Sequence, residues 1–247
     1  MSAAGFVAAD EEAVELTACA AGDEALLAAL VERRLAGEPL AWITGTTSFC
    51  GLSVRVDPGV YVPRWQSEPL ARRGVERLPD RGVAVDLCTG AGALAMALGA
   101  GRPDARVVGC DLDDRSVRCA RSNGADVYQG DLFAPLPREL IGAVDLVIGV
   151  VPYVPTSALP LLPRDTLEFE STLAYDGGAD GTVMLRRAVA GSVEYLRAGG
   201  ALLLELGGEQ VDALRDEMKD LGYLDLEVLT DDDGDVRGLE ATLGGRS

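Results

Sequence analysis

The spacing of apolar residues separates a helical beginning from the rest of the chain. Apolar residues recur at helical intervals over 11–20 and 23–35, which predicts two short helices. Gly22 breaks the pattern between them, and Asp23 offers an N-cap for the second. The pattern therefore predicts a small helical unit at the start of the chain.

A stretch rich in glycine and proline follows, over 37–68. Short apolar runs at 52–56 and 60–62 predict two strands, separated by turn residues at 57–59. We expect this part to be a loop-rich linker rather than a domain with its own core.

From Gly82 onward, buried strands and amphipathic helices alternate. The predicted strands cover 83–88, 106–111, a short run opening at Val127, 144–151 and 201–206, and the predicted helices cover 93–98, 115–123, 183–196 and 209–221. Two final runs, 224–230 and 239–243, predict a hairpin across a turn at 231–234. Alternation of this kind predicts an α/β fold with a mostly parallel sheet covered on both faces. We predict three parts: a helical segment, 1–36; a linker with short strands, 37–80; and the α/β domain, 81–247.

Composition narrows the functional classes. The formal charge of −18 opposes binding to nucleic-acid phosphates, so no nucleic-acid partner is expected. Apolar runs stay short of the roughly 18 residues of a membrane span, and the first residues lack the basic start of a secretory signal. We therefore expect no membrane association and a cytoplasmic location.

The reactive residue types are few. The five cysteines are scattered without a C-x-x-C pair, which indicates neither a metal site nor a disulfide framework. The chain contains no histidine. A general base would have to be Asp, Glu, Tyr, Cys or Lys219, unless the reaction needs none.

The ends of three successive predicted strands carry the candidate chemistry. The first ends in Asp86-Leu87-Cys88-Thr89-Gly90-Ala91-Gly92, where glycines let the backbone approach a ligand at a helix N-terminus. Asp111 ends the second strand about 20 residues later, where a carboxylate can accept hydrogen bonds from ribose hydroxyls. Asp131 follows the third predicted strand, where its carboxylate can accept a hydrogen bond from an adenine amino group. Taken alone, two glycines after a strand are also compatible with a simple tight turn.

Longer motifs resemble the HemK/PrmC-type S-adenosylmethionine-dependent methyltransferases. The motifs are Gly37-Glu38-Pro39-Leu40-Ala41-Trp42-Ile43-Thr44-Gly45, Phe49-Cys50-Gly51-Leu52, Val56-Asp57-Pro58-Gly59-Val60-Tyr61-Val62-Pro63-Arg64, Asp176-Gly177-Gly178-Ala179-Asp180-Gly181 and Glu205-Leu206-Gly207. The resemblance covers most of the chain. It implies a Rossmann-like class I methyltransferase fold, with a seven-stranded sheet, that binds S-adenosylmethionine or its product S-adenosylhomocysteine. It also implies that the N-terminal helices recognise the substrate.

The resemblance assigns the candidate cofactor contacts. Asp86, Gly90 and Gly92 would contact the methionine part, Asp111 the ribose and Asp131 the adenine. The full set of candidate cofactor residues is Asp86, Cys88, Thr89, Gly90, Gly92, Asp111, Leu112, Gly130, Asp131 and Leu132.

The sequence departs from this family at the acceptor motif. Members that methylate a protein glutamine carry Asn-Pro-Pro-Tyr, whereas this chain reads Val150-Val151-Pro152-Tyr153. Valine can neither donate nor accept a hydrogen bond to orient an amide nitrogen. A second departure places Trp65 where the family usually has proline. We expect Trp65, Val150, Val151, Pro152 and Tyr153 to form the substrate site.

Three functions stay open at this point. The acceptor site is repurposed for a largely apolar small molecule, as in natural-product biosynthesis; or the chain is a protein glutamine N5-methyltransferase; or it binds the cofactor without catalysis. The resemblance extends to HemK-like proteins of antibiotic pathways that act beside radical S-adenosylmethionine enzymes in cyclopropane formation. It therefore implies a radical S-adenosylmethionine enzyme that supplies the substrate as one candidate partner. In such a case the fold closes a ring by displacing a sulfonium leaving group instead of transferring a methyl group. The candidate catalytic residues are Tyr153, Glu68 and Glu170.

Overall fold

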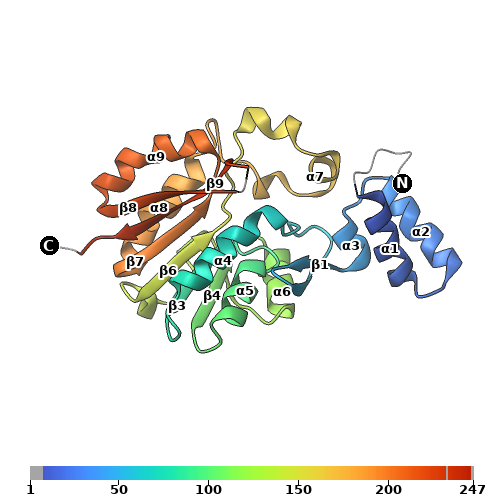
Figure 1. Cartoon of the computed structure of the whole chain (residues 1–247), viewed down its shortest axis with the longest axis horizontal. Helices are drawn as coiled ribbons and strands as arrows, with labels where there is room; N and C mark the ends of the chain where they lie inside the picture. Colours follow the sequence, from blue (N-terminus) through green and yellow to red (C-terminus); the bar gives the residue numbers. More distant parts are fainter. Residues whose placement is uncertain (1–7, 232, 246–247) are drawn as a thin grey trace.

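Two N-terminal helices pack against a third and form a small core of their own (Figure 1). They are α1 (Ala9–Ala20), α2 (Glu24–Leu35) and α3 (Leu40–Thr44). Leu16, Leu30 and Ile43 are the buried centre of this cluster. Asp23 caps α2 by accepting a hydrogen bond from the Leu26 amide, as predicted. This computed structural model describes residues 8–231 and 233–245, so residues 1–7 of the predicted helical segment and residue 232 of the predicted turn lie outside it.

The main sheet has seven strands in the order β5-β4-β3-β6-β7-β9-β8. The strands are β3 (Val83–Leu87), β4 (Arg106–Asp111), β5 (Asp126–Gln129), β6 (Val144–Gly149), β7 (Leu196–Glu205), β8 (Tyr223–Thr230) and β9 (Val236–Leu243). The first five are parallel, and β9 runs antiparallel between β7 and β8. The predicted parallel sheet with an antiparallel C-terminal hairpin is confirmed.

Helices cover both faces of this sheet (Figure 1). They are α4 (Glu68–Arg77), α5 (Ala93–Gly101), α6 (Asp114–Ser122), α8 (Val183–Tyr195) and α9 (Gly208–Asp220). Side chains alternate between the faces along each strand. Leu146 and Ile148 on β6 pack in the cluster that includes α4 and α5, and Val147 packs in the cluster that includes α8 and α9.

The linker differs from the prediction. β1 (Thr46–Phe49) pairs with β2 (Leu52–Arg55) across Cys50-Gly51, two residues with positive φ that make a tight hairpin. The predicted strand at 60–62 is wrong. Its backbone groups bond to side chains instead: the Val60 carbonyl accepts from the Trp42 indole, and the Val62 amide donates to Glu170.

Several short helices also fall where no helix was predicted. Besides α3, these are η2 (Trp65–Ser67), α4, η3 (Arg138–Leu140), η4 (Thr156–Leu161), α7 (Arg164–Phe169) and η5 (Thr172–Ala174). Pro69 in the first turn of α4 suits a helix start. Gly74 lets α4 approach the sheet, since a Cβ there would lie 2.9 Å from the Ile148 side chain.

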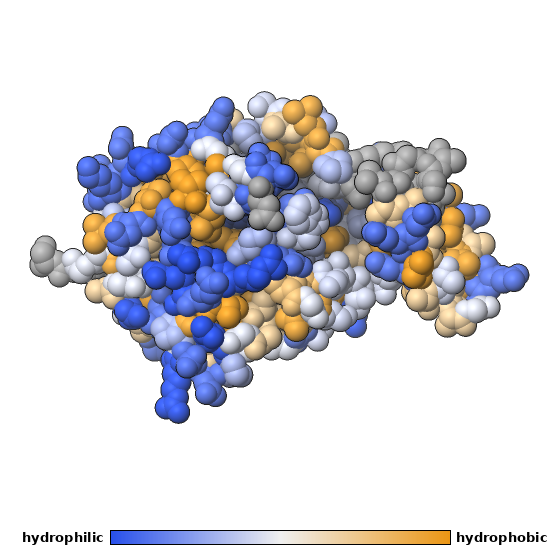
Figure 2. Space-filling model, viewed as in Figure 1, coloured by the Kyte–Doolittle hydropathy of each residue, from blue (hydrophilic) through white to orange (hydrophobic). Residues whose placement is uncertain are grey.

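The N-terminal helices expose some of their apolar side chains. Figure 2 shows apolar residues beside hydrophilic ones there, and Val14, Leu26 and Leu35 are among the exposed large hydrophobic residues. A role of these helices in substrate recognition stays a prediction. Within the described ranges, no helix combines the length and apolar character required to cross a membrane.

Candidate functional site

The candidate site lies at the topological switch point of the sheet. From β3 the chain first adds β4 on one side and later adds β6 on the other. In a doubly wound sheet, ligands bind beyond the carboxyl ends of the strands at this point. Here a cavity of about 610 Å³ opens at the ends of β3, β4 and β5. The three acids of the sequence motif, Asp86, Asp111 and Asp131, all line it.

The structure brings nine of the ten candidate cofactor residues to this first cavity. They are Asp86, Cys88, Thr89, Gly90, Asp111, Leu112, Gly130, Asp131 and Leu132. Gly92 does not line it. Gly92 is the residue before α5, and a Cβ there would lie 3.2 Å from the Ala120 Cβ, so the glycine lets this turn pack closely against α6.

Asp111 is held in a fixed orientation by backbone amides. Its Oδ2 accepts from Gly90 N at 2.8 Å, and its Oδ1 accepts from Asp113 N at 2.9 Å. The bond to Gly90 ties the glycine turn after β3 to the end of β4. A carboxylate fixed at the cavity wall in this way keeps lone pairs available for two hydroxyl groups.

Asp86 is a buried acid with a free oxygen. Its Oδ2 accepts from the Thr89 hydroxyl and from Ala95 N, but Oδ1 has no hydrogen-bond partner in the described part of the chain. Burial raises the pKa of Asp86 to about 7, against the opposing effect of those bonds. A positively charged ligand group would supply the missing partner and favour the ionised form.

Two other lining residues adopt a backbone conformation that side chains rarely take. Cys88, directly after β3, has a φ of 55°, and Leu132, in the turn after β5, has a φ of 46°. Burial raises the pKa of the Cys88 thiol well above its ordinary value, so this cysteine is no nucleophile at neutral pH. Strained residues that gather at one cavity are typical of a ligand site.

Asp131 already has one ion-pair partner in the structure. Its Oδ2 pairs with Arg187 of α8 at 2.7 Å, and both side chains are about half exposed. The second oxygen remains for a ligand, because Asp131 lines the first cavity, as does the exposed Leu112.

A second cavity of about 510 Å³ adjoins the first. The two share Tyr61, Arg64, Val150 and Ala174 as lining residues. The predicted substrate residues divide between them: Trp65, Val151 and Tyr153 line the second, Pro152 the first, and Val150 both. Trp65 is 69% exposed, so it lies at an entrance rather than deep inside.

Tyr153 does not have the environment of a general base. Its hydroxyl donates a hydrogen bond to Glu205 Oε1 at 2.9 Å. Burial and the nearby Glu205 carboxylate both raise the pKa of Tyr153 far above its ordinary value. The phenol therefore stays protonated and serves as a donor.

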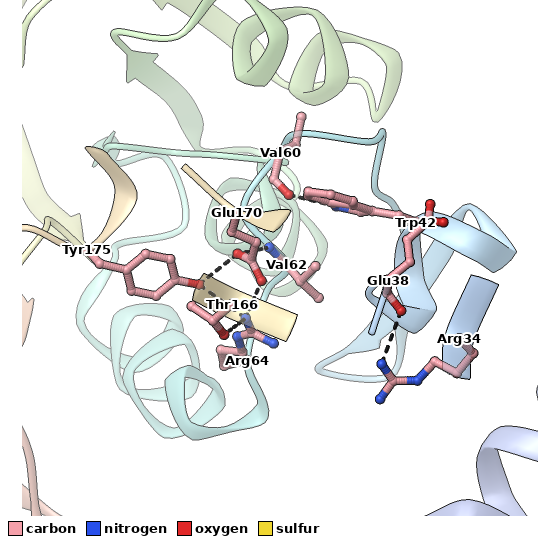
Figure 3. A network of polar contacts seen from close by, with 9 residues as sticks. All are labelled: Arg34, Glu38, Trp42, Val60, Val62, Arg64, Thr166, Glu170 and Tyr175. Carbon is pink, nitrogen blue, oxygen red and sulfur yellow. Dashed lines mark hydrogen bonds and ion pairs between the residues drawn. The ribbon is translucent and has the colours of Figure 1, made fainter. Parts of the chain in front are cut away.

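Glu170 is the centre of a polar network shown in Figure 3. Its carboxylate pairs with Arg64 and accepts from the Tyr175 hydroxyl at 2.7 Å and from Val62 N at 3.2 Å. Arg64 also reaches Thr166 on α7. This network joins segment 60–64 to α7 and the loop after it, and Glu170 lines neither cavity.

Glu68, the other candidate base, lines neither cavity. Its carboxylate accepts from Cys50 N at 2.9 Å and pairs with Arg72 at 3.0 Å, so it joins the β1–β2 hairpin to α4. Neither Glu68 nor Glu170 is placed to take a proton from a ligand in either cavity.

Several lining residues were not on the list of candidates. Tyr61, Arg64 and Glu205 belong to motifs used for the family resemblance, so the sequence held a signal for them. Gln66 lies beside Trp65 on η2 and carried no signal of its own. Among the described residues, no group of three or more Cys, Asp or Glu side chains is arranged to hold a metal ion.

The strand order, the parallel strands with a terminal hairpin and the acids around one cavity define a class I S-adenosylmethionine-dependent methyltransferase. Similar solved structures support the fold. A methyltransferase from Pyrococcus furiosus matches with a TM-score of 0.57 at 18% identity, over 87% of this chain and 98% of that one. The Thermus thermophilus 16S rRNA N2 G1207 methyltransferase, solved with S-adenosylmethionine and guanosine, matches with a TM-score of 0.55 at 17% identity, over 81% and 45%.

Sequence relatives define the family. The release factor glutamine methyltransferase of Geobacter sulfurreducens is 35% identical over 223 residues, which are 88% of this chain and 76% of that protein. The chain belongs to the HemK/PrmC-type family of S-adenosylmethionine-dependent methyltransferases. A 4-amino-L-phenylalanine/4-methylamino-L-phenylalanine methyltransferase of Streptomyces pristinaespiralis is 38% identical over 192 residues, 73% of this chain and 65% of that protein. No family model matches the chain.

The first cavity fits the cofactor of this family. S-adenosylmethionine carries a sulfonium and an ammonium group, and the cavity is lined by Asp86, one oxygen of which has no hydrogen-bond partner among the described residues. It also offers the oriented carboxylate of Asp111 and the glycine turn between them. These groups complement a positively charged nucleoside.

Proposed function

We propose that this protein transfers the methyl group of S-adenosylmethionine to a largely apolar small molecule bound in the second cavity. The observation that carries the proposal is Val150, which lines both cavities at the position where glutamine-modifying relatives have asparagine. Val151 continues the apolar wall toward the second cavity. An apolar wall at this point favours an acceptor that needs no amide recognition.

The remaining residues have consistent roles in this proposal. Asp86, Gly90 and Asp111 hold the cofactor, which supplies an electrophilic methyl group when bound. Val150 and Pro152 exclude water between the two cavities and orient the acceptor toward the first. Positioning of the two reactants is itself a large part of catalysis for a displacement of this kind.

The first prediction tests the alternative of a protein substrate. The protein should not methylate release factor glutamine, because nothing at Val150 can take up the amide hydrogens. With labelled S-adenosylmethionine, we expect a rate at least about 100-fold below that of an authentic release factor glutamine methyltransferase assayed in parallel, as mispositioning alone can cost that much. Transfer at a comparable rate would show that backbone carbonyls suffice and would refute the proposal.

The second prediction concerns Val150 directly. Val150→Asn should lower turnover of an acceptor with an apolar ring, such as 4-amino-L-phenylalanine, by about tenfold, because the new side-chain amide would lose its hydrogen bonds to water without gaining a partner against the ring. Affinity for S-adenosylhomocysteine should stay within about twofold, since the side chain carries none of the proposed cofactor contacts. Val228→Asn on β8 is the matched control, on a half-exposed residue outside both cavities.

Product mass completes this test. Methyl transfer adds one methyl group to the acceptor, whereas ring closure with loss of a sulfonium group adds none. Unchanged turnover in Val150→Asn would mean that the apolar wall does not select the acceptor.

A further inference from the structure

The second cavity is lined by a buried carboxylate, Glu205, of which one oxygen has no hydrogen-bond partner among the described residues. Glu205 ends β7 and is 6% exposed. Its Oε1 accepts from the Tyr153 hydroxyl, while Oε2 has no hydrogen-bond partner within residues 8–231 and 233–245. The Ser67 hydroxyl is near this carboxylate, but the two do not meet in hydrogen-bond geometry. Leaving a buried carboxylate oxygen open is costly unless a ligand or water satisfies it.

A second open acceptor lines the same cavity. Gln66 Oε1 is buried and, in the described ranges, has no hydrogen-bond partner either. Gln66 comes from η2 and Glu205 from β7, so the two side chains reach the cavity from separate elements. Both open atoms accept hydrogen bonds, so a ligand that satisfies them has to donate.

The second cavity is lined by two arginines, Arg64 and Arg237, and both are already engaged, Arg64 with Glu170. Arg237 lines the second cavity, and its guanidinium pairs with Asp231 at 2.7 Å and with Asp235 at 3.4 Å. Burial raises the pKa of Glu205, and the nearby Ser67 hydroxyl, the Tyr153 hydroxyl and the Arg237 charge oppose that rise. A donor that also carries positive charge would favour the ionised carboxylate further.

The rest of the lining is mostly apolar. Val150, Val151, Leu206 and Val236 face the same space as Glu205. This combination suits a molecule with an apolar body and one polar end that donates hydrogen bonds.

We propose that Glu205 and Gln66 bind an amine group of the acceptor substrate, so that amine-bearing, otherwise apolar molecules are the substrate class of this site. Charge-assisted hydrogen bonds from an amine to a buried carboxylate are strong and geometrically selective. The inference rests on the proposed function only in taking the second cavity as the acceptor site. It concerns binding and is testable without turnover.

Four related compounds separate the amine from the rest of the molecule. 4-Amino-L-phenylalanine carries an aromatic and an aliphatic amine, and L-phenylalanine only the aliphatic one. 3-(4-Aminophenyl)propionate carries only the aromatic amine, and 3-phenylpropionate carries neither. All four share the same carboxylate, so differences between them report on the amines. Binding is measured by calorimetry on the protein saturated with S-adenosylhomocysteine, which prevents turnover. At least one amine-bearing compound should bind at least about tenfold more tightly than 3-phenylpropionate. Its identity shows which kind of amine the site takes.

Variants then assign that preference to residues. Glu205→Gln keeps an acceptor for Tyr153 but removes the charge, so the preference should fall to about threefold or less. Gln66→Leu should reduce it by about threefold, as expected for one neutral hydrogen bond. Glu240→Gln on β9 is the control, because Glu240 is a buried carboxylate paired with Arg73 and Arg77 outside both cavities. Thermal melting of every variant shows that it is folded.

The outcomes are distinct. No preference for an amine in the wild-type protein, including no binding of any compound, would overturn the inference. A preference that persists in both Glu205→Gln and Gln66→Leu would also overturn it. A preference that depends on Glu205, without methylation of any compound when S-adenosylmethionine is supplied, would support the inference and count against the proposed function.

Discussion

Replacing Asp111 by alanine should weaken the binding of S-adenosylhomocysteine by about 100-fold. In the proposed site the carboxylate accepts hydrogen bonds from ribose hydroxyls, and charge-assisted bonds of this kind contribute about 1.5–3 kcal/mol each. The substitution also leaves Gly90 N and Asp113 N without their acceptor, so the glycine turn at the cavity loses its fixed position. Calorimetry on the purified variant measures the change.

Asp104→Ala is the matched control for this loss. Asp104 is an exposed acid just before the start of β4, the opposite end of the strand that Asp111 completes, and it should leave the affinity within about twofold. If Asp111→Ala binds as tightly as the wild type, the ribose contact lies elsewhere in the cavity. Failure of the wild type to bind S-adenosylhomocysteine would contradict the assignment of the first cavity to this cofactor.

The cofactor side of the site was predictable because it depends on strand ends. Parallel strands in a doubly wound sheet bring their carboxyl ends to one edge, whatever the rest of the chain does. Asp86 and Asp111 lie in the last two residues of their strands and Asp131 just after its own, so the three acids meet at one cavity. The hairpin of β8 and β9 was equally visible, since its two apolar runs flank a turn rich in aspartate and glycine.

The acceptor side was less predictable because its contacts join distant parts of the chain. Val60 and Val62 have the apolar alternation of a strand, yet their backbone groups are bound by Trp42 and by Glu170, which lies 108 residues beyond Val62. No local pattern indicates such a partner. Glu170 was a reasonable candidate base in a chain without histidine, but only its tertiary position shows that it pairs with Arg64.

That position leads to a prediction about stability rather than chemistry. Glu170→Ala should lower the free energy of unfolding by about 3 kcal/mol, because it leaves the partly buried Arg64 without its counter-charge. The Tyr175 hydroxyl and the Val62 amide lose an acceptor in the same step. For a chain of this size we expect the melting temperature to fall by about 6–12 °C. Glu139→Ala, which removes an exposed pair with Arg106, should cost about 0.5 kcal/mol or less.

Glu170→Gln separates the structural role from a catalytic one. The amide oxygen can still accept from Val62 N or Tyr175, so the loss of stability should be about half that of the alanine variant. Because Glu170 lines neither cavity, methyl transfer by the folded Glu170→Gln protein should stay within about threefold of the wild type. A loss of turnover by a factor of about 100 or more at unchanged stability would instead identify Glu170 as a base.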